Sequence, residues 1–335
     1  MPPDLLAKTP SGLYCAAGDF YIDPSRPVER AVITHGHADH ARKGHGHYLT
    51  VKSNLPILKR RLGQQISTQS LDYEERLKIG DVALSFHPAG HVLGSSQVRL
   101  EKRGLVWVVS GDYKTEDDGL SGAFAPIQCH TFITESTFAL PIYRWDAQSE
   151  IFKKIKDWWK TNQEAGRPSV LFTYSLGKAQ RILYHLEKDL GPILVHRAVA
   201  NMNEAYRENG IPLGETLVID RSHEEAVINR ALIIAPRALQ NSAWYARLTH
   251  PSNAFASGWM RVRGSRHRNN YDRGFVLSDH ADWPGLLKAI EGTEAEKIIV
   301  THGYTAQLIH YLNELGLSAH ALETAMSHAP LKKSR

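Results

Sequence analysis

Cysteine is scarce in this chain. Cys15 and Cys129 are the only two among 335 residues, and they do not form a Cys-x-x-Cys pair. This excludes a disulfide framework and a thiolate metal site. Apolar runs of about 20 residues, the length of a membrane span, are also lacking. The opening Met-Pro-Pro-Asp has no basic segment followed by an apolar one. We therefore expect a protein of the reducing cytoplasm, with no leader peptide and no membrane contact.

The composition otherwise describes a globular chain. Hydrophobic residues make up 42% and charged residues 22%, which is enough to form a buried core. The length suggests about two domains. A net charge of +5 and a sequence pI near 9.0 weakly favour a polyanionic partner. Eighteen histidines are a high number for this length, and they cluster after apolar runs.

Short apolar runs in this sequence stop abruptly at metal-competent residues. Such runs predict buried strands at 31–34, 82–86, 105–110, 131–134, 275–277 and 298–301. The residues that follow them include His35, His91, Asp112, Glu135, His280 and His302. Because sites form where loops converge beyond the ends of strands, this series predicts one shared site.

The middle of the chain has a different pattern. Apolar residues recur at helical spacing over 151–160, a strand is expected at 169–174, and a helix and another strand follow at 178–186 and 231–235. This alternation predicts βαβ units around a parallel sheet. Candidate site residues lie on both sides of it, so we predict a first domain formed by 1–146 and 298–335, with a second domain, 147–297, inserted.

The segment Thr34-His35-Gly36-His37-Ala38-Asp39-His40 is the strongest chemical signal. Side chains two apart in an extended segment point the same way, so His35 and His37 can bind one metal. Asp39 and His40 follow where the chain should turn, and they can face a second ion. Imidazole and carboxylate ligands suit Zn, Mn or Fe. The nearby pair His45 and His47 lacks a following Asp-His and favours a surface loop.

Two later residues extend this set. His91 stands in Ala-Gly-His-Val-Leu-Gly-Ser, at a tight glycine turn suited to metal binding, whereas His87 favours packing at a strand end. Asp112 follows Ser110-Gly111 at the end of a strand. A lone Asp after Gly is usually a turn residue, but its place in the series predicts a ligand that bridges two metals.

At these residues the sequence resembles the metallo-β-lactamase-fold hydrolases. The matching features are Asp23 in Tyr-Ile-Asp-Pro, the His-x-His-x-Asp-His run, His91 in Ala-Gly-His and Asp112 in Ser-Gly-Asp. The resemblance implies an α/β fold, the αββα sandwich of that family. It implies His35, His37 and His91 on one metal, Asp39 and His40 on the other, Asp112 between them, and Asp23 behind the ligands, orienting them.

Further motifs resemble the β-CASP nucleases, which carry an inserted α/β domain. These motifs are Thr134-Glu135-Ser136-Thr137, Ser278-Asp279-His280-Ala281-Asp282 and Val300-Thr301-His302-Gly303. The match implies that His302 completes the second metal's ligands, and that Glu135 and His280 serve the leaving group.

A still closer similarity is to bacterial ligase-associated DNA exonucleases, carried by segments such as Pro141-Ile142-Tyr143-Arg144-Trp145 and Ser257-Gly258-Trp259-Met260. That subgroup implies a cytoplasmic bacterial enzyme of DNA repair, linked to an ATP-dependent DNA ligase and a helicase. His302 favours the other branch, because a His in the third motif is more typical of β-CASP enzymes that process RNA.

The expected chemistry is phosphodiester hydrolysis with two divalent ions, Zn or Mn. Two metals about 3.5–4 Å apart can share a bridging hydroxide and clamp the attacking and leaving oxygens. In this hypothesis a metal-held hydroxide, positioned by Asp112, attacks the phosphorus, and His280, oriented by Glu135, protonates the departing sugar oxygen. Asp39 is counted among the catalytic residues as well as among the metal ligands.

Contacts to nucleic acid are expected at two places. The turn containing Ser175 and Lys178 could present backbone N–H groups and an ammonium to a phosphate. The second place is a basic stretch that contains Arg261, Arg263, Arg266 and Arg268.

Three alternatives remain open: an RNA-processing nuclease, a small-molecule hydrolase such as a lactonase, and a scaffold without activity. The small-molecule hydrolase would have no need of Glu135 and His280, and the scaffold is disfavoured because every expected ligand is present.

Overall fold

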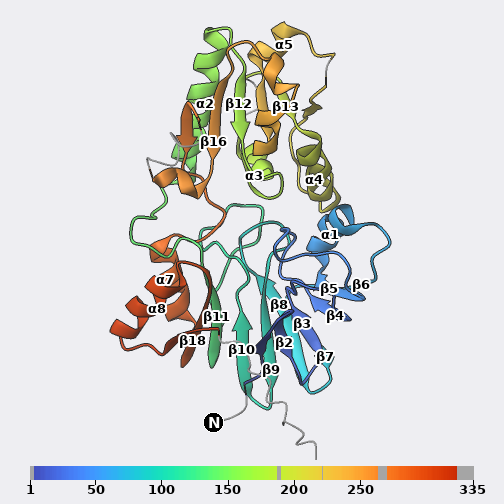
Figure 1. The fold of residues 1–335 in the computed structure, drawn as a ribbon, viewed down its shortest axis with the longest axis vertical. Coiled ribbons are helices and arrows are strands. Elements are labelled where there is room, and N and C mark those ends of the chain that lie inside the picture. The colour runs from blue at the N-terminus through green and yellow to red at the C-terminus, as the bar shows by residue number, and fades with distance from the viewer. Residues whose placement is uncertain (1–3, 187–189, 221, 263–269, 323–335) are drawn as a thin grey trace, which may run out of the picture.

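The computed structural model describes residues 4–186, 190–220, 222–262 and 270–322. Within these residues the chain has a mixed α/β architecture with three sheets (Figure 1). The predicted α/β class is therefore confirmed. None of the described helices is both long and apolar enough to cross a membrane.

Two of the sheets contain the early and late parts of the chain. The first has the order β1 (Ala7–Thr9), β2 (Gly12–Cys15), β3 (Phe20–Ile22), β4 (Arg30–Val32), β5 (His47–Val51) and β6 (Thr68–Leu71). The second has the order β19 (Ala319–Ala321), β18 (Lys297–Gly303), β11 (Thr131–Ser136), β10 (Leu105–Val109), β9 (Ser96–Lys102), β8 (Val82–Pro88) and β7 (Leu77–Ile79). Strands from both ends of the chain thus share one sheet.

These two sheets form the middle of a layered body. Buried apolar residues of both, such as Val32, Val98 and Ile299, belong to one cluster between them. The outer face of the first sheet packs on α1 (Leu55–Leu62), and that of the second on α7 (Trp283–Gly292) and α8 (Thr305–Glu314). The resulting order is helix, sheet, sheet, helices.

The third sheet comes entirely from the middle of the chain. Its order is β14 (Leu217–Val218), β13 (Ile193–Val195), β15 (Leu232–Ala235), β12 (Ser169–Phe172), β16 (Ser252–Ala256) and β17 (Arg273–Phe275). Every pairing in it is parallel, as the alternating pattern predicts. The described helices of this region are α2 (Gln148–Glu164), α3 (Lys178–His185), α4 (Arg197–Glu208) and α5 (Glu225–Arg230). The described residues also include the short 3-10 helices η1 (Lys52–Asn54), η2 (Arg237–Asn241), η3 (Tyr245–Arg247) and η4 (Gly258–Arg261).

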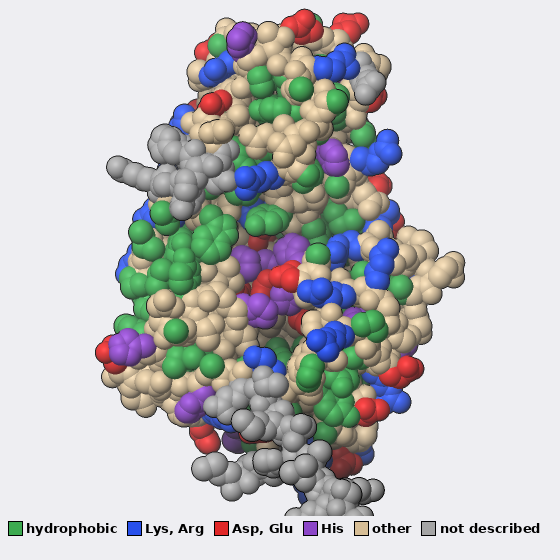
Figure 2. Space-filling model, in the orientation of Figure 1, with side chains coloured by type: hydrophobic (Ala, Val, Ile, Leu, Met, Phe, Trp, Pro, Cys, Tyr) green, Lys and Arg blue, Asp and Glu red, His purple; other side chains and the backbone are tan. Residues whose placement is uncertain are grey.

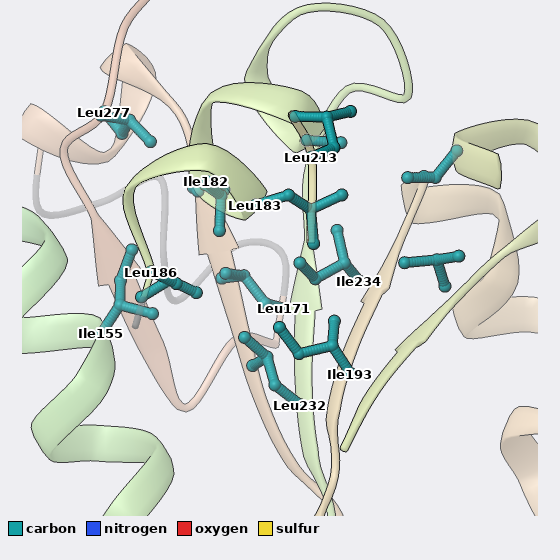
Figure 3. Close-up of a cluster of buried hydrophobic side chains, with 14 of the residues drawn as sticks. Ile155, Leu171, Ile182, Leu183, Leu186, Ile193, Leu213, Leu232, Ile234 and Leu277 are labelled. Atoms are coloured by element: carbon teal, nitrogen blue, oxygen red, sulfur yellow. The ribbon is translucent and has the colours of Figure 1, made fainter. Parts of the chain in front are cut away.

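The core of the third sheet is a cluster of branched aliphatic side chains (Figure 3). Leu171 and Ile234 project from neighbouring strands toward Ile182 and Leu183 of α3 (Figure 3). Trp158 and Trp159 are buried in the same cluster, so the apolar stripe of α2 faces the core. Figure 1 shows this sheet and its helices above the other two sheets, with the connections between them crossing a central waist.

Parallel pairing explains why the strand ends converge. Strands β10, β11 and β18 are adjacent and parallel, so their carboxyl ends meet at one edge of the second sheet. Asp112, Glu135 and His302 stand at or just beyond those ends. That edge faces the waist, where the third sheet begins.

Leu171→Ala should destabilise the protein by about 2–5 kcal/mol, because it leaves a cavity at a fully buried position between a strand and α3. The change is measured by urea unfolding followed by circular dichroism. Leu217→Ala is the matched control, since that leucine lies on β14 and is 53% exposed; its effect should stay below about 0.5 kcal/mol. Equal losses in the two variants would contradict this account of the core.

Candidate metal centre and active site

Three histidines and an aspartate form a tight buried group. His35 Nε2 lies 3.1 Å from His37 Nδ1, and His91 Nε2 lies 3.0 Å from the same atom. Asp112 Oδ2 is 3.5 Å from His35 Nε2. One ligand atom from each of the four residues falls within 4.8 Å of all the others. Side chains from three separate segments of the chain therefore direct their polar atoms at one point.

This group fits a divalent cation. Burial lowers the pKa of His35, His37 and His91, so these rings are neutral and their nitrogens can donate lone pairs. Neutral imidazole is the form that binds metal. Three ring nitrogens at hydrogen-bonding distance cannot all satisfy one another, whereas a shared cation satisfies them together with the Asp112 carboxylate.

Asp23 fixes the histidine segment around Thr34 and His40 from behind. Its carboxylate accepts hydrogen bonds from Thr34 N at 2.8 Å and Thr34 Oγ1 at 2.6 Å, and it lies 2.7 Å from His40 Nδ1. Because His40 uses Nδ1 for Asp23, its Nε2 is left to face the site. Burial alone would lower the pKa of His40, but Asp112 and Asp23 hold it well above its usual value.

His91 and Asp112 are each positioned by a close contact that involves the backbone. His91 Nδ1 lies 2.8 Å from the Asp279 carbonyl oxygen, which directs Nε2 at the cluster. Gly111, before Asp112, has φ +58°, and a Cβ there would lie 2.9 Å from Thr34 Cβ. A larger residue would separate Asp112 from the histidine segment.

The residues predicted for a second metal form a more open set. His40 Nε2 is 3.5 Å from Asp112 Oδ1 and 3.7 Å from Asp39 Oδ2. The His302 ring stacks on the His40 ring with centroids 5.7 Å apart. Within the described residues, the ligand atoms of this set do not all lie within 4.8 Å of one another, as those of the first group do. Asp112 faces both sets, one oxygen toward each.

Glu135 and His280 form a pair beside Asp112. Both oxygens of the buried Glu135 carboxylate lie 2.9–3.0 Å from His280 Nδ1, and Tyr113 N donates to Oε1 at 2.8 Å. Burial would lower the pKa of His280, but the Glu135 carboxylate outweighs it and raises the pKa to about 9. His280 is therefore protonated at neutral pH, with Nε2 available as a donor.

Two cavities meet at these residues. The smaller, about 420 Å³, is lined by His37, His91 and His280 together with Ser175, Tyr174 and Trp259 of the upper part of the molecule. The larger, about 670 Å³, lies between the first two sheets. Asp39, Asp112 and His302 line both cavities. Figure 2 shows the histidines and acidic groups gathered at a hollow in the middle of this face.

The residues predicted to bind nucleic acid lie in different surroundings. Ser175 lines the smaller cavity. Lys178 lines the same cavity but is buried, with Nζ 2.8 Å from Asp279 Oδ2, because the first turn of α3 faces the interior. Arg261 pairs with Asp146 at 3.7 Å. Arg263, Arg266 and Arg268 lie outside the described residues.

Sequence reasoning overlooked Asp279 and Arg181. Arg181 Nη1 donates to the Ser278 carbonyl oxygen at 2.7 Å and lies 3.4 Å from Asp279 Oδ1. A signal for Asp279 existed, since it precedes His280 in a recognised motif. No pattern marked Arg181, which sits in an ordinary helix.

Comparison with known proteins supplies several relatives. No family model matches the chain. It is 28% identical to "Probable DNA ligase" of Opitutus terrae over 326 residues, and this aligned region covers 96% of this chain and 31% of that protein. It is 29% identical to "Endoribonuclease YSH1" of Gibberella zeae over 37% of this chain and 15% of that protein. The "RNase J-like protein" of Methanocaldococcus jannaschii is 23% identical over 71% of this chain and 68% of that protein.

The chain thus spans less than a third of the length of the first two relatives. Among solved structures, a protein of unknown function from Enterococcus faecalis V583 matches with a TM-score of 0.56 and 12% identity over 90% of this chain and 84% of that one, which is a likeness of fold. The relatives fit the metallo-β-lactamase β-CASP family, and the recognition made from the sequence motifs is confirmed.

Asp23→Asn should weaken metal binding about 10- to 100-fold, because a neutral amide holds His40 less firmly. Affinity is measured by competition with a chromophoric chelator. Asp19→Asn is the control because Asp19 is exposed and has a similar backbone conformation, with φ +52° against +45° at Asp23. Unchanged affinity in Asp23→Asn would mean that Asp23 does not position a ligand.

Proposed function

We propose that this chain is a dinuclear-metal-dependent phosphodiesterase that shortens DNA strands from an end in DNA repair. The observation that supports this most directly is the convergence of His35, His37, His91 and Asp112 beside the Glu135–His280 pair. The metal group can hold a phosphate, and the pair can serve a leaving oxygen. A lactonase-like hydrolase would not need that pair.

We further propose the domain organisation of a β-CASP protein. Residues 1–146 and 298–335 would form the metallo-β-lactamase αββα sandwich, and residues 147–297 the inserted domain. The helix, sheet, sheet, helices order of the first body supports this division. So does the third sheet, which is built only from strands between 169 and 275.

Two divalent ions, Zn or Mn, are the proposed cofactors. Bound divalent metal lowers the pKa of water and neutralises the charge that develops on a phosphate. His35, His37 and His91 would hold one ion, and Asp39, His40 and His302 the other. Asp112 would contact both, since its two oxygens face the two sets. Asp23 would keep His40 in its ligand orientation.

His280 is the proposed general acid. The Glu135 carboxylate keeps the ring protonated and orients it through Nδ1. Nε2 would then deliver a proton to the sugar oxygen that leaves the phosphorus, and Glu135 would stabilise the ring while it is charged. Trp145 Nε1 donates to the His280 carbonyl at 2.9 Å, and Asp282 caps α7 directly after this segment. These contacts limit the movement of the loop.

RNA is the second candidate substrate. Two observations favour it: His302 occupies a position typical of RNA enzymes in the family, and relatives named as an endoribonuclease and as RNase J-like occur. DNA is supported by the relative named as a DNA ligase, whose similarity extends over 96% of this chain. That relative also motivates the proposed functional link to a DNA ligase. The ATP dependence of that ligase, a link to a helicase and a location in the bacterial cytoplasm are proposed from the resemblance of the sequence motifs.

The purified protein supplied with Zn or Mn should shorten end-labelled single-stranded DNA stepwise, as resolved on a denaturing gel. An RNA strand of matched sequence is tested in parallel. Asp112→Ala should abolish cleavage, because it removes the carboxylate that faces both metal sets. Preferential RNA cleavage would replace the DNA assignment by the RNA candidate. Cleavage that persists in Asp112→Ala would overturn the proposed site.

His280→Ala should lower the turnover number about 10²- to 10⁴-fold on DNA while metal content, measured by mass spectrometry, stays unchanged. The loss should largely disappear with bis(4-nitrophenyl) phosphate, whose phenolate leaves without needing a proton. His310→Ala, at an exposed histidine of α8, is the control. Loss of metal, or an equal loss on both substrates, would contradict an acid role for His280.

A further inference from the structure

An aromatic cluster borders the candidate active site on one side. Phe138, Tyr143, Trp145, Trp259 and Tyr304, which we term the aromatic flank, have neighbouring rings with centroids 4.7–6.5 Å apart. The flank reaches the reacting groups, since the Phe138 ring lies 5.8 Å from the His280 ring.

Trp259 is the outermost member of this flank. Phe138 and Tyr143 are 2% exposed, whereas Trp259 is 37% exposed and lines the same cavity as His91, Asp112 and His280. Gly258 allows this placement, because a Cβ there would lie 2.6 Å from Phe138 Cζ. The tightly packed turn η4 therefore fixes an indole ring at the edge of the site.

The opposite side of the site is basic. Arg61 lines the smaller cavity and donates a hydrogen bond to the Gly36 carbonyl. Arg42 lines the larger cavity and is exposed, and its guanidinium forms no ion pair within the described part of the chain. We term these two residues the basic flank. Figure 2 shows apolar side chains on one side of the histidine and acid group and Lys and Arg side chains on the other.

We propose that Trp259 is a stacking platform for one unpaired nucleobase of a single strand, whose phosphates run along the Arg42 and Arg61 side. This rests on the proposed nuclease function and names the form of its substrate. A strand with charged phosphates on one edge and apolar bases on the other matches the two unlike flanks. In a duplex both faces of an internal base are covered by its neighbours, so Trp259 selects unpaired bases.

The contact is pre-organised. Tyr143 Oη lies 3.1 Å from Tyr304 Oη, and Trp145 Nε1 is bound to the His280 carbonyl, so the rings beneath Trp259 are anchored to the loop that carries His280. A base stacked on the indole would thereby have its phosphate positioned relative to the reacting groups. Trp259 is a substrate-positioning residue in this proposal.

The test compares two labelled strands of equal length, oligo-dT and a fully abasic strand, binding to Asp112→Ala protein, which should leave them uncleaved. By fluorescence anisotropy, the further change Trp259→Ala should weaken oligo-dT binding about 10-fold and leave the abasic strand unaffected. Trp259→Phe should recover most of the loss. Tyr184→Ala is the matched control, an aromatic residue 39% exposed that does not line the cavity.

Equal weakening for both strands, or none for oligo-dT, would overturn the stacking role. So would a duplex whose binding depends on Trp259 to the same extent. Binding and cleavage are measured separately. If Trp259→Ala weakens binding of oligo-dT alone but the wild-type protein hydrolyses no strand, the stacking role stands and the nuclease function is refuted. If the wild-type protein hydrolyses DNA but Trp259→Ala does not weaken binding of oligo-dT selectively, only the stacking role is refuted.

Discussion

The structure depends on one electrostatic constraint, the convergence of buried polar atoms that cannot satisfy one another. His35, His37 and His91 direct neutral ring nitrogens at a common point, together with the Asp112 carboxylate. A buried polar atom without a partner costs about 1–3 kcal/mol, so several at one point would oppose folding unless a cation is shared. Gly111, which lets Asp112 approach Thr34, and the backbone carbonyl of Asp279, which contacts His91, both support this arrangement.

Two aspartates support the cluster from opposite sides. Asp23, from the first sheet, holds Thr34 and His40. Asp279 offers its backbone carbonyl to His91, while its carboxylate pairs with Lys178 and Arg181 of α3. Burial would raise the pKa of Asp279, but these two cations hold it well below the usual range. A buried ion pair therefore ties α3 to the site, and one of its members is Lys178, the lysine predicted to bind phosphate.

The surroundings of the site complement its chemistry. The smaller cavity is shared between the ligand segments and residues of the upper part of the molecule, including Ser175 and Trp259. A strand bound in this cavity would therefore contact both the two-sheet body and the part of the molecule built on the third sheet. The aromatic flank matches the apolar bases of a single strand, and the basic flank matches its charged phosphates. The proposed form of the substrate therefore agrees with the proposed reaction.

The sequence alone determined the α/β class, the parallel pattern of the middle region and the family, because strand periodicity and closely spaced ligands are local properties. Six consecutive residues contain His35, His37, Asp39 and His40, so their capacity to bind metal can be predicted without knowledge of the fold. Tertiary structure decided what depends on distant segments: the buried contact of Asp279 with Lys178 and Arg181, and the exposure of Trp259 where Trp158 and Trp159 are buried. A residue's type sets what it can bind, but its partner and its access to solvent are fixed only when segments distant in the sequence pack together.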